Sequence, residues 1–115
     1  MPIEAISRLD PVIHSKVRLA VMSILVSVRD ASFTYLKTAI GTTDGNLSFS
    51  LTKLEEAGYI KVKKSFQGKK PLTTCSVTDK GRDAFSRHVE ALNTILYLEK
   101  SKDGKPNERK GYVNQ

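Results

Sequence analysis

Three residues whose side chains could make specific contacts with a ligand lie close together in the segment TTDGNLSFSLTKLEEAGYI, residues 42–60. The amide of Asn46 could pair with an adenine edge through two hydrogen bonds, and the ring of Phe49 could meet a thymine methyl group. The ammonium group of Lys53 could reach guanine or a phosphate. Because the three residues are spaced three and four positions apart, a helix would present them on one side. Their types and spacing indicate a surface that reads base edges in a DNA groove.

The other side of the same segment predicts how this surface is held. Leu47, Leu51 and Leu54 are spaced four and three positions apart, which predicts a helix with a leucine stripe against a core. Ser48 and Ser50 flank the outer face and suit phosphate oxygens. The residues expected to contact DNA from this helix are Thr43, Asn46, Ser48, Phe49, Ser50 and Lys53.

Simpler interpretations of the same residues stay open. Thr43 can act as the N-cap of the helix, and Asn46 could also serve only as a capping residue. Phe49 could pack under a neighbouring element, and Lys53 could be an ordinary solvated lysine. Gly45 in the first turn has no side chain, so the backbone there could approach DNA closely. Glycine has no other obvious merit at this position.

Two short strands are expected after this helix. Within residues 59–66, Ile60, Val62 and Phe66 alternate with polar residues, as in a half-buried strand. Residues 72–77 alternate again, and the run QGKKP between the two segments has the composition of a turn. The two strands therefore predict a hairpin.

The predicted hairpin is strongly basic. Five lysines and no acidic residue fall between positions 61 and 70. Lysines on an exposed strand could serve only to prevent edge-to-edge aggregation. The flexible tip with two following lysines favours contact with phosphates, which would make binding depend steeply on salt. The residues expected to contact DNA from the hairpin are Lys63, Lys64, Gln67, Lys69 and Lys70.

Three more helices are expected, at residues 11–29, 32–40 and 78–99. In the last of them, Phe85, Val89, Leu92 and Leu96 form a core-type stripe. The first is apolar on more than one face, which suggests that part of it packs against another subunit. A short connection that begins at Gly41 links the helix expected at 32–40 to the following helix, which ends at Gly58. Two helices with such a tight connection are typical of a helix-turn-helix. The order of the elements predicts an α+β, mostly helical fold. This fold is a winged helix-turn-helix with a three-helix core, a two-stranded wing and a C-terminal helix.

Composition narrows the classes of function. The chain has 115 residues, enough for one domain, and a formal net charge of +7, which favours an anionic partner such as nucleic acid or a membrane surface. The most apolar segment, residues 17–28, is too short to span a bilayer. We find no signal peptide and expect a cytoplasmic protein that does not bind membranes.

Metal, redox and catalytic chemistry find little support in the sequence. Cys75 is the single cysteine, so it cannot form an internal disulfide, and it fits a half-buried strand. His14 and His88 are far apart in sequence and have no carboxylate or cysteine at ligand spacing. We therefore expect no metal, no cofactor and no catalytic residues, and the protein is not expected to be an enzyme.

With these elements placed, the chain resembles the small stand-alone winged-helix transcriptional regulators that are related to the MarR and ArsR groups. The resemblance rests on LDPVIHSKVRLAVMSIL at 9–25, TDGNLSFSLTKLEEAGYI at 43–60 and KSFQGKKPLTTCSVTDKGRDAF at 64–85. It departs from the family at Ser50, where a basic residue or histidine is usual, and at Thr52, where arginine is frequent.

The resemblance implies a homodimer that binds double-stranded DNA. The first and last helices would form the interface, and one recognition helix per subunit would enter the major groove. A winged-helix domain with dimerisation helices at both ends is expected over residues 9–99, followed by a polar, flexible tail over 100–115. The residues expected at the dimer interface are Ile13, Leu19, Met22, Val89, Leu92, Ile95 and Leu96.

Two alternatives to a DNA-binding regulator stay open. Winged helices also serve as protein–protein interaction modules that do not bind specific DNA. A metal or redox sensor is another possibility, but one cysteine and two histidines give it little support. The sequence does not reveal an operator, an effector or whether regulation is positive or negative.

Overall fold

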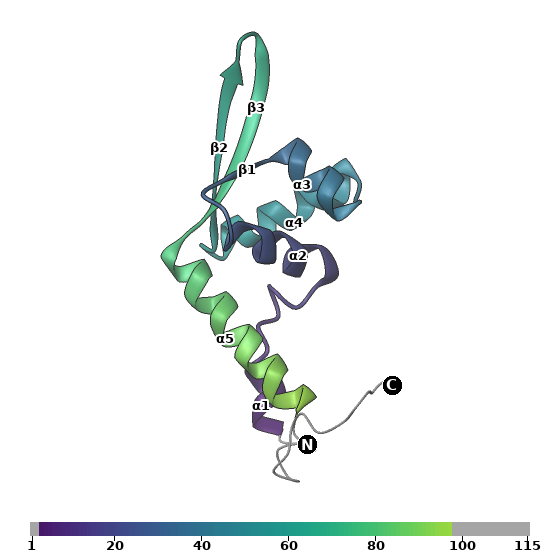
Figure 1. Ribbon diagram of the computed structural model, residues 1–115, viewed down its shortest axis with the longest axis vertical. Coiled ribbons are helices and arrows are strands. Elements are labelled where there is room, and N and C mark those ends of the chain that lie inside the picture. The colour runs from purple at the N-terminus through teal and green to yellow at the C-terminus, as the bar shows by residue number, and fades with distance from the viewer. Residues whose placement is uncertain (1–2, 98–115) are drawn as a thin grey trace.

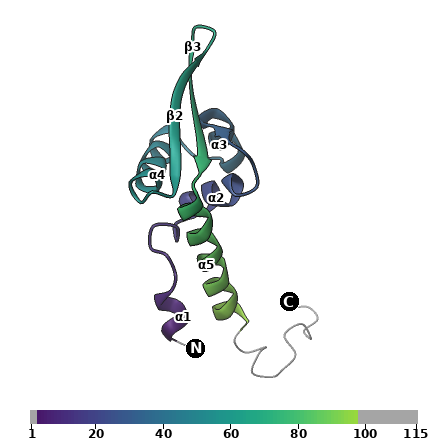
Figure 2. The same cartoon turned by 90° about the vertical axis from the view of Figure 1, so that its left-hand side faces the viewer.

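The computed structural model describes residues 3–97, which form five helices and three strands (Figure 1). In chain order they are α1 (Ile3–Ser7), α2 (Lys16–Leu25), β1 (Ala31–Ser32), α3 (Phe33–Ile40), α4 (Asp44–Glu56), β2 (Ile60–Gln67), β3 (Lys70–Val77) and α5 (Asp79–Leu96). Helices α2, α3 and α4 pack together beside the base of the β2–β3 hairpin, and α5 leads away from that base (Figures 1 and 2). The predicted winged helix-turn-helix is confirmed.

Helices α3 and α4 form the helix-turn-helix. Ser32 caps α3 through a hydrogen bond from the Tyr35 N–H, and α3 ends at Gly41, whose φ of 75° is left-handed. This conformation is accessible to glycine without a steric penalty, and it turns the chain towards α4. The ammonium of Lys37 in α3 lies 2.9 Å from the Asp44 carboxylate, which joins α3 to the first residue of α4.

The three strands form an antiparallel sheet in the order β1-β3-β2. Strands β2 and β3 pair from Ile60–Val77 at the base to Gln67–Lys70 at the tip. Two further pairs, Ala31–Cys75 and Ser32–Thr74, add β1, which the sequence did not predict. The hairpin extends beyond the helices at the end of the molecule opposite α5 (Figures 1 and 2). We call this hairpin, residues 60–77, the wing.

The interior of the wing differs from the prediction at Phe66. Ile60 is buried and Val62 is half-buried, as the alternation predicts, whereas Phe66 on the same face is 72% exposed. The prediction was wrong at this residue because the wing is longer than the helical core beside it. Only the first part of the apolar face therefore has the core to pack against.

Helix α2 occupies the centre of the domain and contacts α3, α4, α5 and β3. It begins at Lys16 with Ser15 as its N-cap, later than the predicted start at residue 11. Met22 is fully buried in the core cluster, and so is Ile13 just before the helix. Their prediction as dimer contacts was wrong, because elements of the same protomer bury both side chains completely.

Helix α5 packs against the domain with a face different from the predicted one. Its buried residues are Gly81, Ala84, His88 and Ala91. The larger apolar residues expected to form the core stripe lie half-buried or exposed, and the most exposed of them is Leu96 at 66%. Small side chains let α5 approach its neighbours closely, so the bulky stripe is left on the outside. Helix α1, which the sequence did not predict, packs against α5.

Two further expectations concern the ends of the chain and membranes. The predicted polar tail, residues 100–115, lies outside the described residues, as do the last two positions of the helix expected over 78–99. Within residues 3–97, no helix combines the length and the apolar character needed to cross a membrane.

Candidate nucleic-acid interface

Helix α4 exposes the face that the sequence predicted. Leu47, Leu51 and Leu54 are buried, whereas Asn46 and Lys53 on the opposite side are exposed. Thr43 forms the N-cap, and its Oγ1 accepts a hydrogen bond of 3.1 Å from the Asn46 N–H. Because Thr43 supplies the capping oxygen, the Asn46 side chain is not required for that role. Contact of this face with DNA stays a prediction.

Phe49 lies on the exposed face of α4 with 58% of its surface accessible. The alternative in which Phe49 packs under a neighbouring element is therefore wrong for the protomer. The Lys53 ammonium lies 5.4 Å from the centre of the Phe49 ring, within the range of a cation–π interaction. The two side chains thus form one apolar and positively charged unit on the outer surface of the helix.

Ser50 does not belong to the exposed face. Its side chain is only 4% exposed, so the prediction that it contacts DNA was wrong. Ser50 lies three positions after Leu47 and four before Leu54, which places it on the buried stripe. Ser48 and Thr52, two positions before and after Ser50, are both exposed.

The wing presents its basic side chains to solvent. Lys63, Lys64, Gln67, Lys69 and Lys70 are all exposed, as expected. A cleft of about 220 Å³ separates the wing from α4. Its polar walls are Ser48, Thr52 and the acidic Glu55 of α4, and Lys64 and Thr73 of the wing. Lys64 therefore faces the side of the wing on which α4 lies. Strand alternation places Lys63 on the other side.

Lys64 of the wing and Ser48 and Thr52 of α4 thus line one cleft, and the other lysines of the wing and the face with Asn46, Phe49 and Lys53 are exposed outside it. Within residues 3–97, we find no group of three or more His, Cys, Asp or Glu side chains that could hold a metal ion. The surface offers positive charge, an amide, hydroxyl groups and one aromatic ring. This combination suits a polyanion with accessible apolar and hydrogen-bonding edges.

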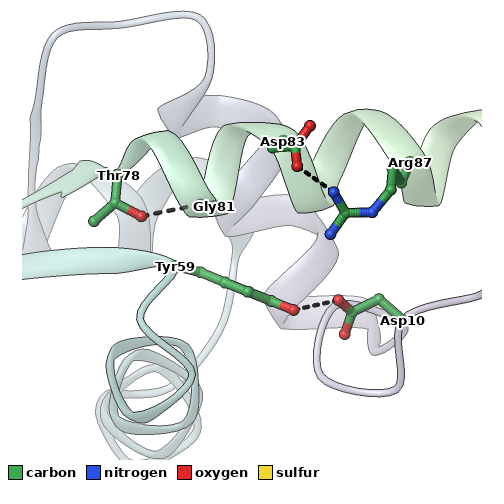
Figure 3. Close-up of polar contacts among 6 residues, drawn as sticks. All are labelled: Asp10, Tyr59, Thr78, Gly81, Asp83 and Arg87. Carbon is green, nitrogen blue, oxygen red and sulfur yellow. Dashed lines mark hydrogen bonds and ion pairs between the residues drawn. The ribbon is translucent and has the colours of Figure 1, made fainter.

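A polar cluster that the sequence did not predict joins α5 to the rest of the domain, and Figure 3 draws one of its contacts, that between Tyr59 and Asp10. The Tyr59 hydroxyl donates to Asp10 Oδ2 at 2.5 Å, and the Asp10 N–H donates to His88 Nδ1 at 2.9 Å. His88 is fully buried, and its Nε2 lies 3.4 Å from Nδ1 of His14. Asp10 and His14 are distant in sequence from both Tyr59 and His88, so spacing alone could not bring these residues together.

Burial and neighbouring side chains shift the pKa values of two residues in this cluster, Tyr59 and His88. Burial, followed by the hydrogen bond to Asp10, raises the pKa of Tyr59 to about 12. Burial, followed by the charge of His14, lowers the pKa of His88, while Asp10 opposes that shift. Both shifts favour the neutral forms of the two side chains. Tyr59 and His88 therefore act as neutral hydrogen-bonding groups of a structural joint at physiological pH.

The start of α5 is fixed to the end of the α4–β2 connection. Thr78 Oγ1 donates to the Gly58 carbonyl at 2.7 Å and accepts from the Gly81 N–H at 2.9 Å (Figure 3). The Thr78 N–H also donates to the Tyr59 carbonyl at 3.0 Å. A Cβ atom at Gly81 would lie 2.0 Å from that carbonyl oxygen, so only glycine allows this approach.

Cys75 lies buried in β3 and faces the core. Burial, and to a smaller extent the charge of Glu55, raises the pKa of its thiol to about 11. The thiol is therefore protonated near neutral pH, which gives it low reactivity. This environment agrees with the structural role expected for a half-buried strand residue.

The remaining residues expected at a dimer interface lie at the surface or near it. Val89, Leu92 and Ile95 of α5 are half-buried, and Leu96 is exposed. Leu19 of α2 is half-buried and packs against the core cluster. Helix α5 therefore carries an apolar side that the described part of the protomer covers only in part.

Comparison with known sequences gives a family match and a curated relative. The family model described as a winged helix DNA-binding domain matches residues 17–96. An uncharacterized protein of Methanocaldococcus jannaschii is 37% identical over 90 residues, which cover 78% of this chain and 95% of the relative. The description of the matched family is one of DNA binding and not of catalysis.

Solved structures share the fold. A transcriptional regulator homologue from Pyrococcus horikoshii superposes with a TM-score of 0.75 at 26% identity, covering 81% of this chain and 94% of that one. The transcriptional repressor CouR, solved bound to a 23-mer DNA duplex, gives 0.65 at 20% identity, covering 87% and 75%. A protein assigned to the MarR family, from Enterococcus faecalis, gives 0.61 at 20% identity, covering 88% and 84%.

Proposed function

Because this chain belongs to the winged helix DNA-binding domain family, we propose that it is a transcriptional regulator that binds specific double-stranded DNA as a homodimer. The observation that carries the proposal is the exposed face of α4 beside a lysine-rich wing. Asn46, Phe49 and Lys53 project from a helix whose other side is anchored by leucines. A rigid helix with exposed base-reading side chains is what the major groove accommodates.

The proposed division of contacts follows from the chemistry of each region. Asn46 and the Phe49–Lys53 unit of α4 read base edges, because amide, aromatic and ammonium groups match the patterns in the major groove. Thr43 and Ser48 contact phosphates near the ends of that surface. The wing binds the backbone through Lys63, Lys64, Gln67, Lys69 and Lys70, which supplies affinity without sequence information.

The homodimer is proposed to form through the outer side of α5. This side carries Val89, Leu92, Ile95 and Leu96, and α1 adds Ile6, which is partly exposed as well. A two-fold axis there would place the two copies of α4 far apart on the same side of the dimer. The operator would then consist of inverted half-sites separated by about one helical turn, roughly 34 Å centre to centre.

Selection from a library of random duplex DNA tests the proposed specificity. The unaltered protein should enrich one palindromic motif. Phe49→Ala should enrich a motif that is relaxed at one position in each half-site, because a single base contact is lost. Tyr35→Ala is the matched control, since Tyr35 of α3 is an aromatic residue with a similar exposure of 57%, and it should leave the motif unchanged.

The outcomes of the selection separate the alternatives. If no motif is enriched by the unaltered protein, specific regulation is the wrong function and an interaction module becomes the better account. If a motif is enriched and Phe49→Ala leaves it unaltered, the protein reads DNA but Phe49 does not contact bases.

Sedimentation tests the proposed interface separately. Leu96→Glu places a charge on the exposed side of α5 and should convert the dimer to a monomer that still folds. Val28→Glu changes another partly exposed apolar residue, outside α5, and should leave the dimer intact. A Leu96→Glu protein that remains dimeric would show that α5 is not the interface.

A further inference from the structure

Phe66 of β2 has the largest exposed fraction, 72%, of the large hydrophobic residues in the described part of the chain. It lies one residue pair before the tip of the wing, directly across from Pro71, which is also exposed. A single exposed apolar residue needs no special explanation. Phe66 differs because it shares one face of a projecting hairpin with an apolar partner.

The surroundings of Phe66 indicate the chemistry of what could cover it. Lys64, Lys69 and Lys70 lie within a few residues of it, and the hairpin has no acidic residue between positions 61 and 70. A suitable partner is therefore negatively charged on its outside and apolar within reach of a phenyl ring. A second copy of the wing would bring like charges together, which opposes that contact. Duplex DNA has phosphates outside and stacked bases inside.

The orientation of Phe66 is compatible with a contact to the same duplex as α4. Side chains alternate along a strand, so Phe66 points to the same side of β2 as Val62 and Lys64. Those two residues line the cleft between the wing and α4. Phe66 thus faces the α4 side of the wing, further out along the hairpin, where the wing extends past the helices (Figure 2).

The dimensions of DNA favour the minor groove for this contact. With α4 in a major groove, a wing beside it meets the neighbouring minor groove. That groove is about 6 Å wide, whereas two paired strands with their side chains are wider, so the hairpin itself cannot enter. The wing would lie across the groove with its lysines on the phosphates, and a single side chain such as Phe66 could enter.

We propose that Phe66, supported by Pro71, is an apolar wedge that the wing inserts into the minor groove at one base-pair step in each half-site. This inference rests on the proposed function and adds a deformation of the DNA to it. Inserted apolar side chains partly unstack a step and bend the duplex towards the major groove. Pyrimidine–purine steps such as TA unstack most easily, so the wedge selects such a step without hydrogen bonds.

A bending experiment with a fluorescent base tests the wedge. The probe is a duplex of about 30 base pairs that carries the selected motif, with dyes at both ends for energy transfer. A second probe has 2-aminopurine in place of the adenine of the flanking TA step. The unaltered protein should shorten the distance between the dyes and raise the 2-aminopurine fluorescence, because that base loses stacking.

Three variants separate the wedge from other contacts of the wing. Phe66→Ala should remove most of the bend and of the fluorescence change and weaken binding about tenfold, the scale of one lost aromatic–base contact. Phe66→Leu keeps an apolar wedge and should retain both signals. Tyr35→Ala changes an exposed aromatic residue of α3, outside the wing, and should retain them too. Circular dichroism should show all three folded, because both side chains are exposed.

The outcomes distinguish this inference from the function on which it rests. Tight binding to a duplex that stays straight and stacked would overturn the wedge alone. A Phe66→Ala protein that bends DNA like the unaltered protein would do the same. A change of oligomeric state in Phe66→Ala without loss of bending would assign Phe66 to a contact between copies and overturn the wedge. No binding of any duplex by the unaltered protein would overturn the wedge and the proposed function together.

Discussion

The first turns of α4 and α5 have similar sequences and very different surroundings. Each follows a threonine N-cap, Thr43 or Thr78, and each contains an aspartate at its first position and a glycine, Gly45 or Gly81. A Cβ atom at Gly45 would meet nothing within 4 Å, whereas one at Gly81 would lie 2.0 Å from the Tyr59 carbonyl oxygen. Similar N-terminal residues therefore begin a helix with an exposed first turn in α4 and a helix with a closely packed first turn in α5.

This difference shows how the molecule separates stability from binding. The start of α5 is joined to the core through Thr78, the Tyr59 backbone and the cluster around His88. The start of α4 is held by one cap and one ion pair, so its outer face is left free for a ligand. Substitutions in the first region should change folding, and those in the second should change DNA binding. Four predictions test that separation.

The largest expected effect is that of Gly81→Ala. The added methyl group would collide with the Tyr59 backbone, which cannot move aside as a flexible side chain could. We expect the free energy of unfolding to fall by about 3 kcal/mol, the upper range for overpacking a well-packed site. Urea denaturation measures it. A loss below about 1 kcal/mol would show that α5 can shift away without penalty and that the joint is loose.

The two capping threonines should differ in their contributions. Thr43→Ala removes one capping bond at an exposed site and should cost about 1 kcal/mol. Thr78→Ala also removes the hydrogen bond that the hydroxyl donates to the Gly58 carbonyl, so it should cost about 2 kcal/mol. Thermal or urea unfolding of both variants measures the difference. Equal losses would contradict the greater structural role assigned to the start of α5.

The joint should weaken in acid because His88 is buried in its neutral form. Its Nδ1 accepts the Asp10 N–H, which places the ring proton of the neutral form on Nε2 beside His14. Since burial lowers the pKa of folded His88, its contribution is present above pH 6.5, the unfolded value, and is lost as the pH falls through the folded pKa.

Unfolding free energies measured between pH 7.5 and 5 test this dependence on His88. The stability should decline with a slope no steeper than one proton allows, about 1.4 kcal/mol per pH unit. His88→Gln removes the titrating group and should flatten the decline at the cost of lower stability. A decline that is identical in both proteins would assign the effect to other groups.

The smallest expected change in stability is that of Gly45→Ala, which should stabilise the protein, whereas the preceding substitutions should destabilise it. Because the Cβ atom has open space, alanine should stabilise α4 by roughly 0.5–1 kcal/mol through lower backbone entropy in the unfolded state. Affinity for the selected duplex should nevertheless fall several-fold, because the methyl group would stand between the helix backbone and DNA. An affinity that stays the same or rises would show that DNA does not approach Gly45.

The elements with strong local patterns could be predicted from sequence, and those that depend on distant contacts could not. Leu47, Leu51 and Leu54 predicted α4 and its exposed face. The same period places Ser50 on the buried stripe, although its polar side chain favours an exposed position. Phe66 fitted the alternation of a strand, which contains no information about how far the helical core extends.

Packing also decided the environment of α5 and the cluster around His88. The steps of three and four that link Gly81, Ala84, His88 and Ala91 form a helical stripe, but small residues and a histidine looked less like a core than the bulky residues beside them. Contact of His88 with Asp10 and His14 spans more than seventy positions. Strand β1 has only two residues, too few for a pattern.

The salt dependence of duplex binding tests the central claim most directly. Fluorescence anisotropy with the selected duplex should give an affinity that falls steeply and linearly with salt on a logarithmic plot. Each lost phosphate contact changes the slope by about 0.9, so replacing both Lys69 and Lys70 by alanine should make it shallower by about two. Lys80→Ala, an exposed lysine at the start of α5, should leave the slope unchanged. A protein that binds the duplex without salt dependence, or that binds no duplex at all, would contradict the account.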